Sequence, residues 1–246
     1  MTINPQVGNV RIIGFYITNG NKGVEVKVSS HIHIANCVIG NSVGDGLYVN
    51  SDYTASVVTQ VEIYNNVFYR NGASGISFQG CTSLNGVDFC YANIMNNIFL
   101  QNHTYGIWGA TSYYTHVGFA NRVTINFNDM YGNSTASYGG HIGSGQSVVP
   151  DPNETPNAPQ FVGEDTSLGI DMRLQSGSPC RHAGSESTAF NNPDGTRNDQ
   201  GAYGGPYCAT FFESVTDGPF VRQLSIVPGS VPQGSTFSIS ATAAVR

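Results

Sequence analysis

The chain carries few charged residues. Of its 246 residues only 10 are Lys or Arg and 16 are Asp or Glu, which gives a formal net charge of −6. A dilute negative charge argues against nucleic acid or an anionic membrane as the partner, since both attract basic surfaces. No apolar run is long enough to cross a bilayer, and no signal peptide is recognisable.

Helical periodicity is missing as well. No window of the sequence sustains an apolar period of 3.6 residues, and Gly, Asn, Ser and Thr interrupt the chain throughout. An all-β fold is therefore expected.

A repeat is what the sequence does contain. Glycine followed by an aliphatic residue recurs at Gly23, Gly46, Gly75 and Gly106, and we place Gly140 in the same column although His141 follows it. Asparagine recurs every 31 residues in two columns, one at Asn66, Asn97 and Asn128 and one at Asn71, Asn102 and Asn133. A fixed period indicates stacked units, none of which buries its apolar face alone.

Each copy contains two strand patterns. The first alternates apolar and polar residues, as in Val61-Glu62-Ile63, and the second follows the glycine, as in Ile76-Ser77-Phe78. Asparagine suits the turn between them because it tolerates the left-handed backbone region, and equivalent Asn amides of stacked coils can form a hydrogen-bonded ladder. The pattern predicts a parallel β-solenoid with coils of about 22 residues plus loops.

The phrases VEIYNNVFYRNGASGISF and ANIMNNIFLQNHTYGIW resemble right-handed parallel β-helix repeats of the pectate-lyase-like superfamily. The tail RLQSGSPCRHAGSESTAFNNPDGTRNDQGAYGGP is similar to the segment that closes the helix in secreted bacterial proteins of that group. The resemblance covers roughly residues 9–206. It implies a right-handed parallel β-helix, a secreted or cell-surface location, and a polysaccharide as partner.

Two domains are expected. Residues 1–210 form the β-helix with its closing segment, and residues 211–246 form either the start of an Ig-like β-sandwich module or a capping hairpin around Pro232-Gln233-Gly234. The chain begins inside a repeat without the usual terminal cap, so we expect it to be attached to further domains of a longer protein.

The five cysteines suggest two crosslinks. Cys180 and Cys208 bracket the Gly- and Asp-rich tail, and Cys81 and Cys90 bracket a loop. Both pairs are disulfide candidates, with buried thiols as the alternative, and we predict the Cys180–Cys208 bridge. Cys37 falls in the Asn66 column, where a buried thiol is expected.

The resemblance implies two candidate chemistries. Lyases of this superfamily use Ca²⁺ or another neutralising cation with an Arg or Lys base, whereas the hydrolases use paired carboxylates. The outward bases are Arg11, Lys27, Arg70 and Arg122. The adjacent Asp pair of the hydrolases is missing, and Asp45 reads as a solvated turn residue. A lyase is thus favoured over a hydrolase, but no catalytic residue is assigned.

No cofactor is assigned either, although the resemblance makes Ca²⁺ a candidate. The best local Ca²⁺ candidate is the run of residues 194–199, whose spacing does not match a calcium loop, so a tight turn bonded by its own side chains is favoured. His31 and His33 point outward from one strand and form no metal set with the other histidines.

The second strand presents a column of outward residues suited to a sugar. Two residues after each glycine stand Glu25, Tyr48, Ser77, Trp108 and, by our alignment, Ile142, with Asn50 and Gln79 in the next column. Aromatic rings cover the apolar face of a pyranose and amides bond its hydroxyls. We therefore name Trp108, Tyr48, Gln79, Asn50 and Glu25 as candidate ligand-binding residues, with burial of Trp108 under a loop at Tyr113-Tyr114 as the alternative.

The sequence thus predicts a secreted β-helix fragment that binds an extracellular polysaccharide. Whether it also cleaves the polysaccharide stays open, with a lyase favoured if it is catalytic. The competing hypothesis is a non-catalytic spacer of a bacterial surface adhesin. The sequence does not identify the sugar.

Overall fold

The computed structural model describes residues 1–4, 8–51, 58–79, 83–84, 87–88, 90–109, 123–140, 151, 153–166, 169–208, 220–226 and 239–244. The chain divides into two compact units, Met1–Cys208 and Ala209–Arg246. The first unit carries the repeat.

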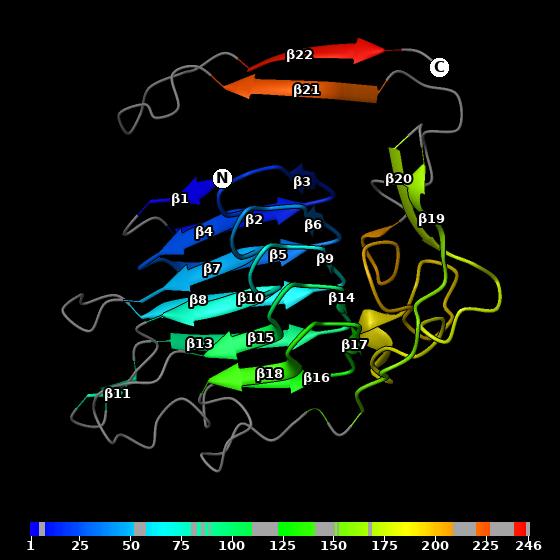
Figure 1. Cartoon of the computed structure of the whole chain (residues 1–246), viewed down its shortest axis with the longest axis horizontal. Helices are drawn as coiled ribbons and strands as arrows, with labels where there is room; N and C mark the ends of the chain where they lie inside the picture. Colours follow the sequence, from blue (N-terminus) through cyan, green and yellow to red (C-terminus); the bar gives the residue numbers. More distant parts are fainter. Residues whose placement is uncertain are drawn as a thin grey trace. The chain divides into compact units, whose positions relative to one another are not determined.

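Successive turns of the chain stack as coils in three parallel sheets (Figure 1). Sheet A contains β1 (Thr2–Ile3), β4 (Val24–Lys27), β7 (Leu47–Asn50), β10 (Ile76–Gln79), β15 (Tyr105–Gly109) and β18 (Ala136–Gly140). Sheet B contains β2 (Gly8–Ile13), β5 (Ser30–Ala35), β8 (Thr59–Tyr64), β13 (Cys90–Met95) and β16 (Val123–Asn126). Sheet C contains β3 (Tyr16–Thr18), β6 (Val38–Gly40), β9 (Val67–Tyr69), β14 (Ile98–Leu100) and β17 (Asp129–Tyr131).

This architecture is the predicted all-β, right-handed parallel β-helix. Each coil contributes one strand to every sheet, and inward side chains such as Ile34, Phe68 and Phe78 form one continuous core. Every coil thus depends on its neighbours to cover its apolar face, as in other solenoids.

The coil has three strands, where the sequence pattern predicted two. The missed strands are those of sheet C, and they are only three residues long. In β9 and β14 every residue is buried, because Phe68 and Phe99 face the core while their neighbours face a second apolar cluster outside the sheet. A strand buried on both faces shows no alternation, so period-two reasoning does not detect it.

Two asparagine ladders hold the coils in register, as predicted. Asn66 Nδ2 donates to Asn97 Oδ1 and Asn97 Nδ2 to Asn128 Oδ1, each at 3.0 Å. Asp151 ends the ladder by accepting from the Asn128 backbone N–H at 2.7 Å. At the other end, the Cys37 N–H donates to Asn66 Oδ1, and the Cys37 thiol is buried as expected.

The second ladder joins Asn71, Asn102 and Asn133 through Nδ2-to-Oδ1 bonds of 2.9 Å. All these ladder amides also bond backbone groups, so they satisfy polar atoms that the turns would otherwise leave buried without partners.

The left-handed residue of each turn is the one before the ladder residue. Asn65 and Asn96 have φ of 53° and 60°, whereas the ladder residues Asn66 and Asn97 have no positive φ. Two neighbouring asparagines thus have different roles in the turn. The first adopts the left-handed backbone conformation that Asn tolerates, and the second donates and accepts the side-chain hydrogen bonds of the ladder.

The glycine column marks close contact between coils. A Cβ atom at Gly75 would lie 2.6 Å from Phe99 Cδ1 and 2.7 Å from the Gly106 carbonyl oxygen. Our placement of Gly140 in this column is wrong, because Trp108 pairs with Gly139 and the residue level with Gly106 is Ser137. Ile142, which depended on that placement, lies outside the described residues.

The closing segment lies along the outer face of sheet C. It includes the antiparallel pair β19 (Phe161–Thr166) and β20 (Gly169–Leu174) and the short 3₁₀ turn η2 (Thr188–Phe190). Phe161, Met172, Cys180 and Ala202 pack on outward residues of sheet C such as Val67 and Ile98. Figure 1 shows these segments beside the stack.

The turn asparagines fasten this segment to the coils. Asn36 Nδ2 donates to the carbonyls of Ala202 and Gly204 at 2.8 Å each, and Asn65 Nδ2 donates to the Asp199 carbonyl at 2.8 Å. The Ser185 N–H donates to Asn96 Oδ1 at 2.8 Å. Three successive coils thus bind the segment through the same position of the turn.

The predicted Cys180–Cys208 disulfide is wrong, because both residues carry thiols. Cys180 is fully buried in the apolar cluster on sheet C, and burial raises the pKa of its thiol. Hydrogen bonds with the side-chain amides of Asn36, Asn65 and Asn96 hold the segment that we expected a disulfide to hold. Cys81, the partner proposed for Cys90, lies outside the described residues.

Asp129, the first residue of β17, is a buried carboxylic acid. Its Oδ1 accepts from the Asn157 N–H at 3.3 Å, while Oδ2 has no hydrogen-bond partner within the described part of the chain. Burial raises the pKa of Asp129 from 3.8 to about 8, against smaller opposing effects of Thr155 and Asn157. The group is thus protonated at neutral pH.

Two further strand pairs are antiparallel. β11 (Ser83–Leu84) pairs with β12 (Val87–Asp88), and in the second unit β21 (Phe220–Ile226) pairs with β22 (Ile239–Ala244). We expected residues 211–246 to form either the start of an Ig-like module or a capping hairpin. An antiparallel pair of strands fits both, so it does not distinguish them and the Ig-like module stays a prediction.

We predict that Asn97→Ala lowers the free energy of unfolding by about 1–3 kcal/mol, because Asn66 loses its ladder acceptor and two backbone carbonyls lose a donor. Thermal unfolding measures this as a lower Tm. Asn21→Ala, at an exposed turn position, is the matched control and should melt like the wild type. Equal Tm values for Asn97→Ala and the control would contradict a structural role for the ladder.

We predict that Asp129→Asn removes part of the pH dependence of stability. Since the pKa is raised on folding, the unfolded chain ionises Asp129 first, and the wild type loses stability as pH rises from about 4 to about 8, with no further loss above that. The Tm of Asp129→Asn relative to wild type should therefore rise across this window. Asp194, in an exposed turn with a lowered pKa, is the control, and its Asn variant should show a constant difference above pH 5. A pH-independent difference for Asp129→Asn would contradict the buried-acid assignment.

Candidate functional site

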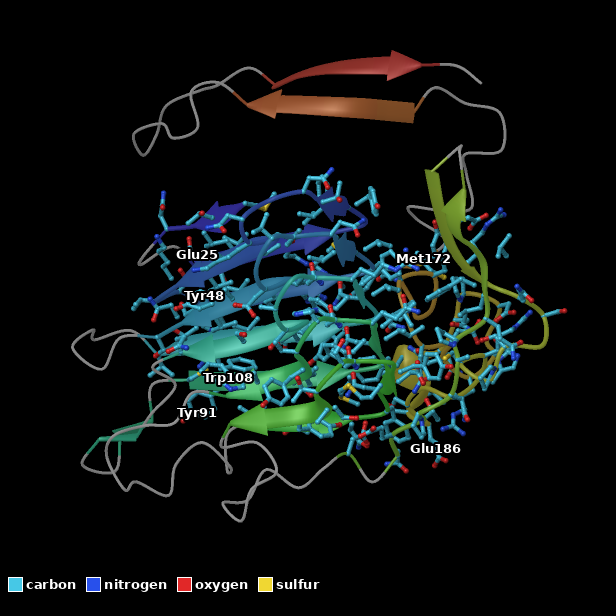
Figure 2. All side chains as sticks on the ribbon, in the orientation of Figure 1. Glu25, Tyr48, Tyr91, Trp108, Met172 and Glu186 are labelled. Atoms are coloured by element: carbon cyan, nitrogen blue, oxygen red, sulfur yellow. The ribbon has the colours of Figure 1, made fainter. Side chains whose placement is uncertain are left out.

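The predicted ligand-binding residues lie on the outer face of sheet A. Strand pairing places Glu25, Tyr48, Ser77 and Trp108 level with one another on β4, β7, β10 and β15. Figure 2 shows Glu25, Tyr48 and Trp108 following one another along the stack. Lys27, Asn50 and Gln79 form the neighbouring column, so all five candidates are on one face.

The Glu25 end of this face is a charged cluster. Lys22 Nζ lies 2.9 Å from Glu25 Oε1 and Lys27 Nζ lies 3.4 Å from Oε2. Partial burial raises the pKa of Glu25, but the two ammonium groups outweigh it and the net pKa is lowered. Lys22 Nζ also lies 3.3 Å from the centre of the Tyr48 ring, a cation–π contact that occupies one side of that ring.

The middle of the face is fixed by Asp45. Its Oδ1 accepts from the Ser74 N–H at 3.0 Å and from Ser77 Oγ at 2.6 Å. The carboxylate thus links two coils. Asp45 is in a turn, as we interpreted it, but its carboxylate is half-buried and bonded to Ser74 and Ser77 rather than solvated.

Trp108 is half-buried at the far end of the row. Its strand partner on the next coil is Gly139, and the Tyr105 ring lies against that glycine, since a Cβ atom there would be 2.4 Å from Tyr105 Cε1. A Cβ atom at the following residue, Gly140, would lie 3.1 Å from Trp108 Nε1. Tyr113 and Tyr114, which we considered as an extension or a cover of this surface, lie outside the described residues.

Sheet B carries a second polar face, formed by the outward positions of the alternating first strand. Strand pairing places one such residue of each coil at the same level, on five successive strands: Arg11, His33, Glu62, Asn93 and Thr124. The alternating pattern predicts this column of polar residues, but it does not predict a binding surface there.

One end of this face is covered by the closing segment. The His33 ring contacts the rings of Tyr64 and Tyr207 at centroid distances of 5.5 and 5.9 Å, and Tyr64 contacts Phe190 at 5.4 Å. The Arg11 guanidinium lies 5.6 Å from the centre of the Tyr207 ring. Burial lowers the pKa of His33 although Glu62 Oε2 lies 3.4 Å away, so the imidazole is neutral at pH 7.

The other end of the sheet B face forms a groove with a volume of about 480 Å³. It spans β5, β8, β13 and β16, and it is lined by His31, Gln60, Val61, Glu62, Tyr91, Ala92, Asn93 and Thr124. The prediction that His31 and His33 point outward is correct, but only His31 lines the groove. The sequence pattern places Thr124 on the outward face but gave no signal for Gln60 or Tyr91, and it assigned none of the three to a site.

Those of the bases and metal candidates named from the sequence that the structure describes do not lie together at one site. Arg70 Nε donates to Gln101 Oε1 at 2.8 Å, and Arg122 lies outside the described residues. In the run 194–199, Asp194 Oδ1 accepts from both the N–H and the hydroxyl of Thr196, as in a self-bonded turn. In the described part of the chain, no three His, Cys, Asp or Glu residues are placed to hold a metal ion.

None of the described helical segments is long and apolar enough to span a membrane. A search of curated proteins and a search of solved structures each return no match. Residues 2–118 match the family model described as "Right handed beta helix region". This match covers the coils through β15, and the stacked parallel sheets continue the same architecture to β18, so the first unit has a right-handed β-helix fold.

Proposed function

We propose that this chain binds an extracellular polysaccharide on the outer face of sheet A. The observation that supports this proposal is the register that places Tyr48, Ser77 and Trp108 side by side on consecutive coils. Because neighbouring strands lie about 4.8 Å apart, Tyr48 and Trp108 are separated by roughly 10 Å along the stack. A sugar chain running along the helix axis would contact both rings.

The side chains around Trp108 suit sugar hydroxyls. Gln79 and Asn50 are half-buried amides in the adjacent column, two residues along their strands from Ser77 and Tyr48. Amides both donate and accept hydrogen bonds, as a pyranose ring requires. Glu25 contributes at the edge, where Lys22 and Lys27 hold its carboxylate in place.

Binding is the activity that this face supports best, and cleavage is the secondary proposal. The carboxylates described on sheet A and its turns include Glu25, held by two lysines, and Asp45, held by two serine groups. A lyase would need an Arg or Lys base, and Lys27, which pairs with Glu25, is the base nearest to the row. As part of the proposal, the chain is secreted or exposed at a cell surface.

A non-catalytic spacer is the second candidate function. The two Asn ladders and the continuous core give the solenoid the stiffness that a surface adhesin would need. In that case the sheet A face would bind no glycan. Incubation with uronate polysaccharides, followed by absorbance of unsaturated products and by thermal shift, distinguishes a lyase, a binding protein and a spacer.

We predict that Trp108→Ala weakens polysaccharide binding about tenfold or more. Loss of one aromatic contact with a sugar removes on the order of 1–2 kcal/mol of apolar contact, which corresponds to roughly tenfold in affinity. Titration calorimetry with a panel of neutral and uronate polysaccharides measures the change.

Tyr16→Ala is the matched control, because Tyr16 is an exposed aromatic residue on sheet C. It should bind as the wild type does, and both variants should keep the wild-type Tm. If Trp108→Ala is folded and binds every glycan like the wild type, sheet A is not the site. If the wild type binds no glycan of the panel, the spacer function is supported instead.

A further inference from the structure

The groove on sheet B has two parallel columns of polar side chains. Gln60 and Tyr91 face each other across β8 and β13, while Glu62, Asn93 and Thr124 are level on β8, β13 and β16. The columns are two residues apart, or about 6.7 Å along the strand. The buried positions Val61 and Ala92 lie between them.

The groups that line this groove combine one aromatic ring with several hydrogen-bonding side chains. Tyr91 supplies the ring, Gln60 and Asn93 supply amides, and Thr124 supplies a hydroxyl. A cavity of this volume with few polar groups at fixed positions is typical of a small-ligand site. An aromatic face beside amides and a hydroxyl fits a ring that is apolar on its face and rich in hydroxyls at its edge.

Asn93 carries an acceptor without a partner beside the groove. Its Nδ2 donates to the Tyr64 hydroxyl at 2.8 Å, while its Oδ1 is buried and has no hydrogen-bond partner in the part of the chain that is described. Buried polar atoms are normally satisfied. Because solvent does not reach this oxygen, a ligand hydroxyl would bond it only after the amide turns toward the groove.

Glu62 determines the charge of the ligand. Its side chain is 57% exposed, and its Oε2 lies 3.4 Å from Nδ1 of His33, whose pKa is lowered by burial. Arg11, the nearest cation in the same column, is two strands from Glu62 and packs on Tyr207. A carboxylate ligand would be repelled by Glu62, whereas a hydroxyl would donate to it.

From these contacts we infer that the groove on sheet B is a second binding site, which takes one or two uncharged sugar residues and rejects uronates. Tyr91 stacks on the sugar ring, Gln60, Asn93 and Thr124 bond its hydroxyls, and Glu62 accepts from a hydroxyl and excludes acidic sugars. This site is on a different sheet from Trp108 and does not depend on the function proposed for sheet A.

The test measures binding of neutral disaccharides and of a matching uronic acid disaccharide by titration calorimetry and ligand-observed NMR. We expect the wild type to bind at least one neutral disaccharide about tenfold or more tightly than the uronate. Glu62→Gln keeps the hydrogen-bonding shape and removes the charge, so it should bring the two affinities within about threefold. Tyr91→Ala should weaken neutral binding about tenfold.

Tyr16→Ala, at an exposed aromatic residue of sheet C outside both proposed sites, is the matched control and should leave disaccharide binding unchanged. Trp108→Ala then distinguishes the two sites, because a disaccharide bound in the groove loses affinity on Tyr91→Ala, whereas one bound on sheet A loses affinity on Trp108→Ala. If Tyr91→Ala does not keep the wild-type Tm, Gln60→Ala takes its place and should weaken binding at least about fivefold. The inference is overturned if no neutral disaccharide binds, if folded Tyr91→Ala or Gln60→Ala binds like the wild type, or if Glu62→Gln still rejects the uronate.

Discussion

The fixed register between coils is the constraint on which the rest of this structure depends. It is maintained by buried amide hydrogen bonds that repeat from coil to coil, from Cys37 through Asn66, Asn97 and Asn128 to Asp151. These amides occupy turn positions where backbone groups are buried and need partners. A slip of one residue would move the inward Ile and Phe side chains of all three sheets out of the core.

This register also aligns residues that are far apart in the sequence into rows across each sheet. Tyr48 and Trp108 are 60 positions apart in the chain, yet strand pairing places them on one face of sheet A with only Ser77 between them. The same pairing brings Glu62, Asn93 and Thr124 together on sheet B. A parallel β-helix therefore offers a separate binding surface on every sheet that remains accessible.

The closing segment determines which faces of the three sheets remain accessible. It covers the outer face of sheet C with apolar side chains and reaches one end of sheet B through Phe190 and Tyr207. Its attachment relies on Asn36, Asn65 and Asn96 rather than on a disulfide. The described part of sheet A and the His31 end of sheet B carry the polar and aromatic groups from which we propose ligand binding.

The sequence by itself determined the solenoid, the two Asn ladders and the outward position of Trp108 and Tyr48, because each depends on a periodic pattern of residue types. It did not determine the third sheet, since strands buried on both faces have no alternation, nor the last coil, where Ser137 replaces the expected glycine. The thiol state of Cys180, the raised pKa of Asp129 and the groove at Tyr91 were decided only by the tertiary structure. Each of these arises where segments distant in sequence meet, and a local pattern does not contain the identity of such neighbours.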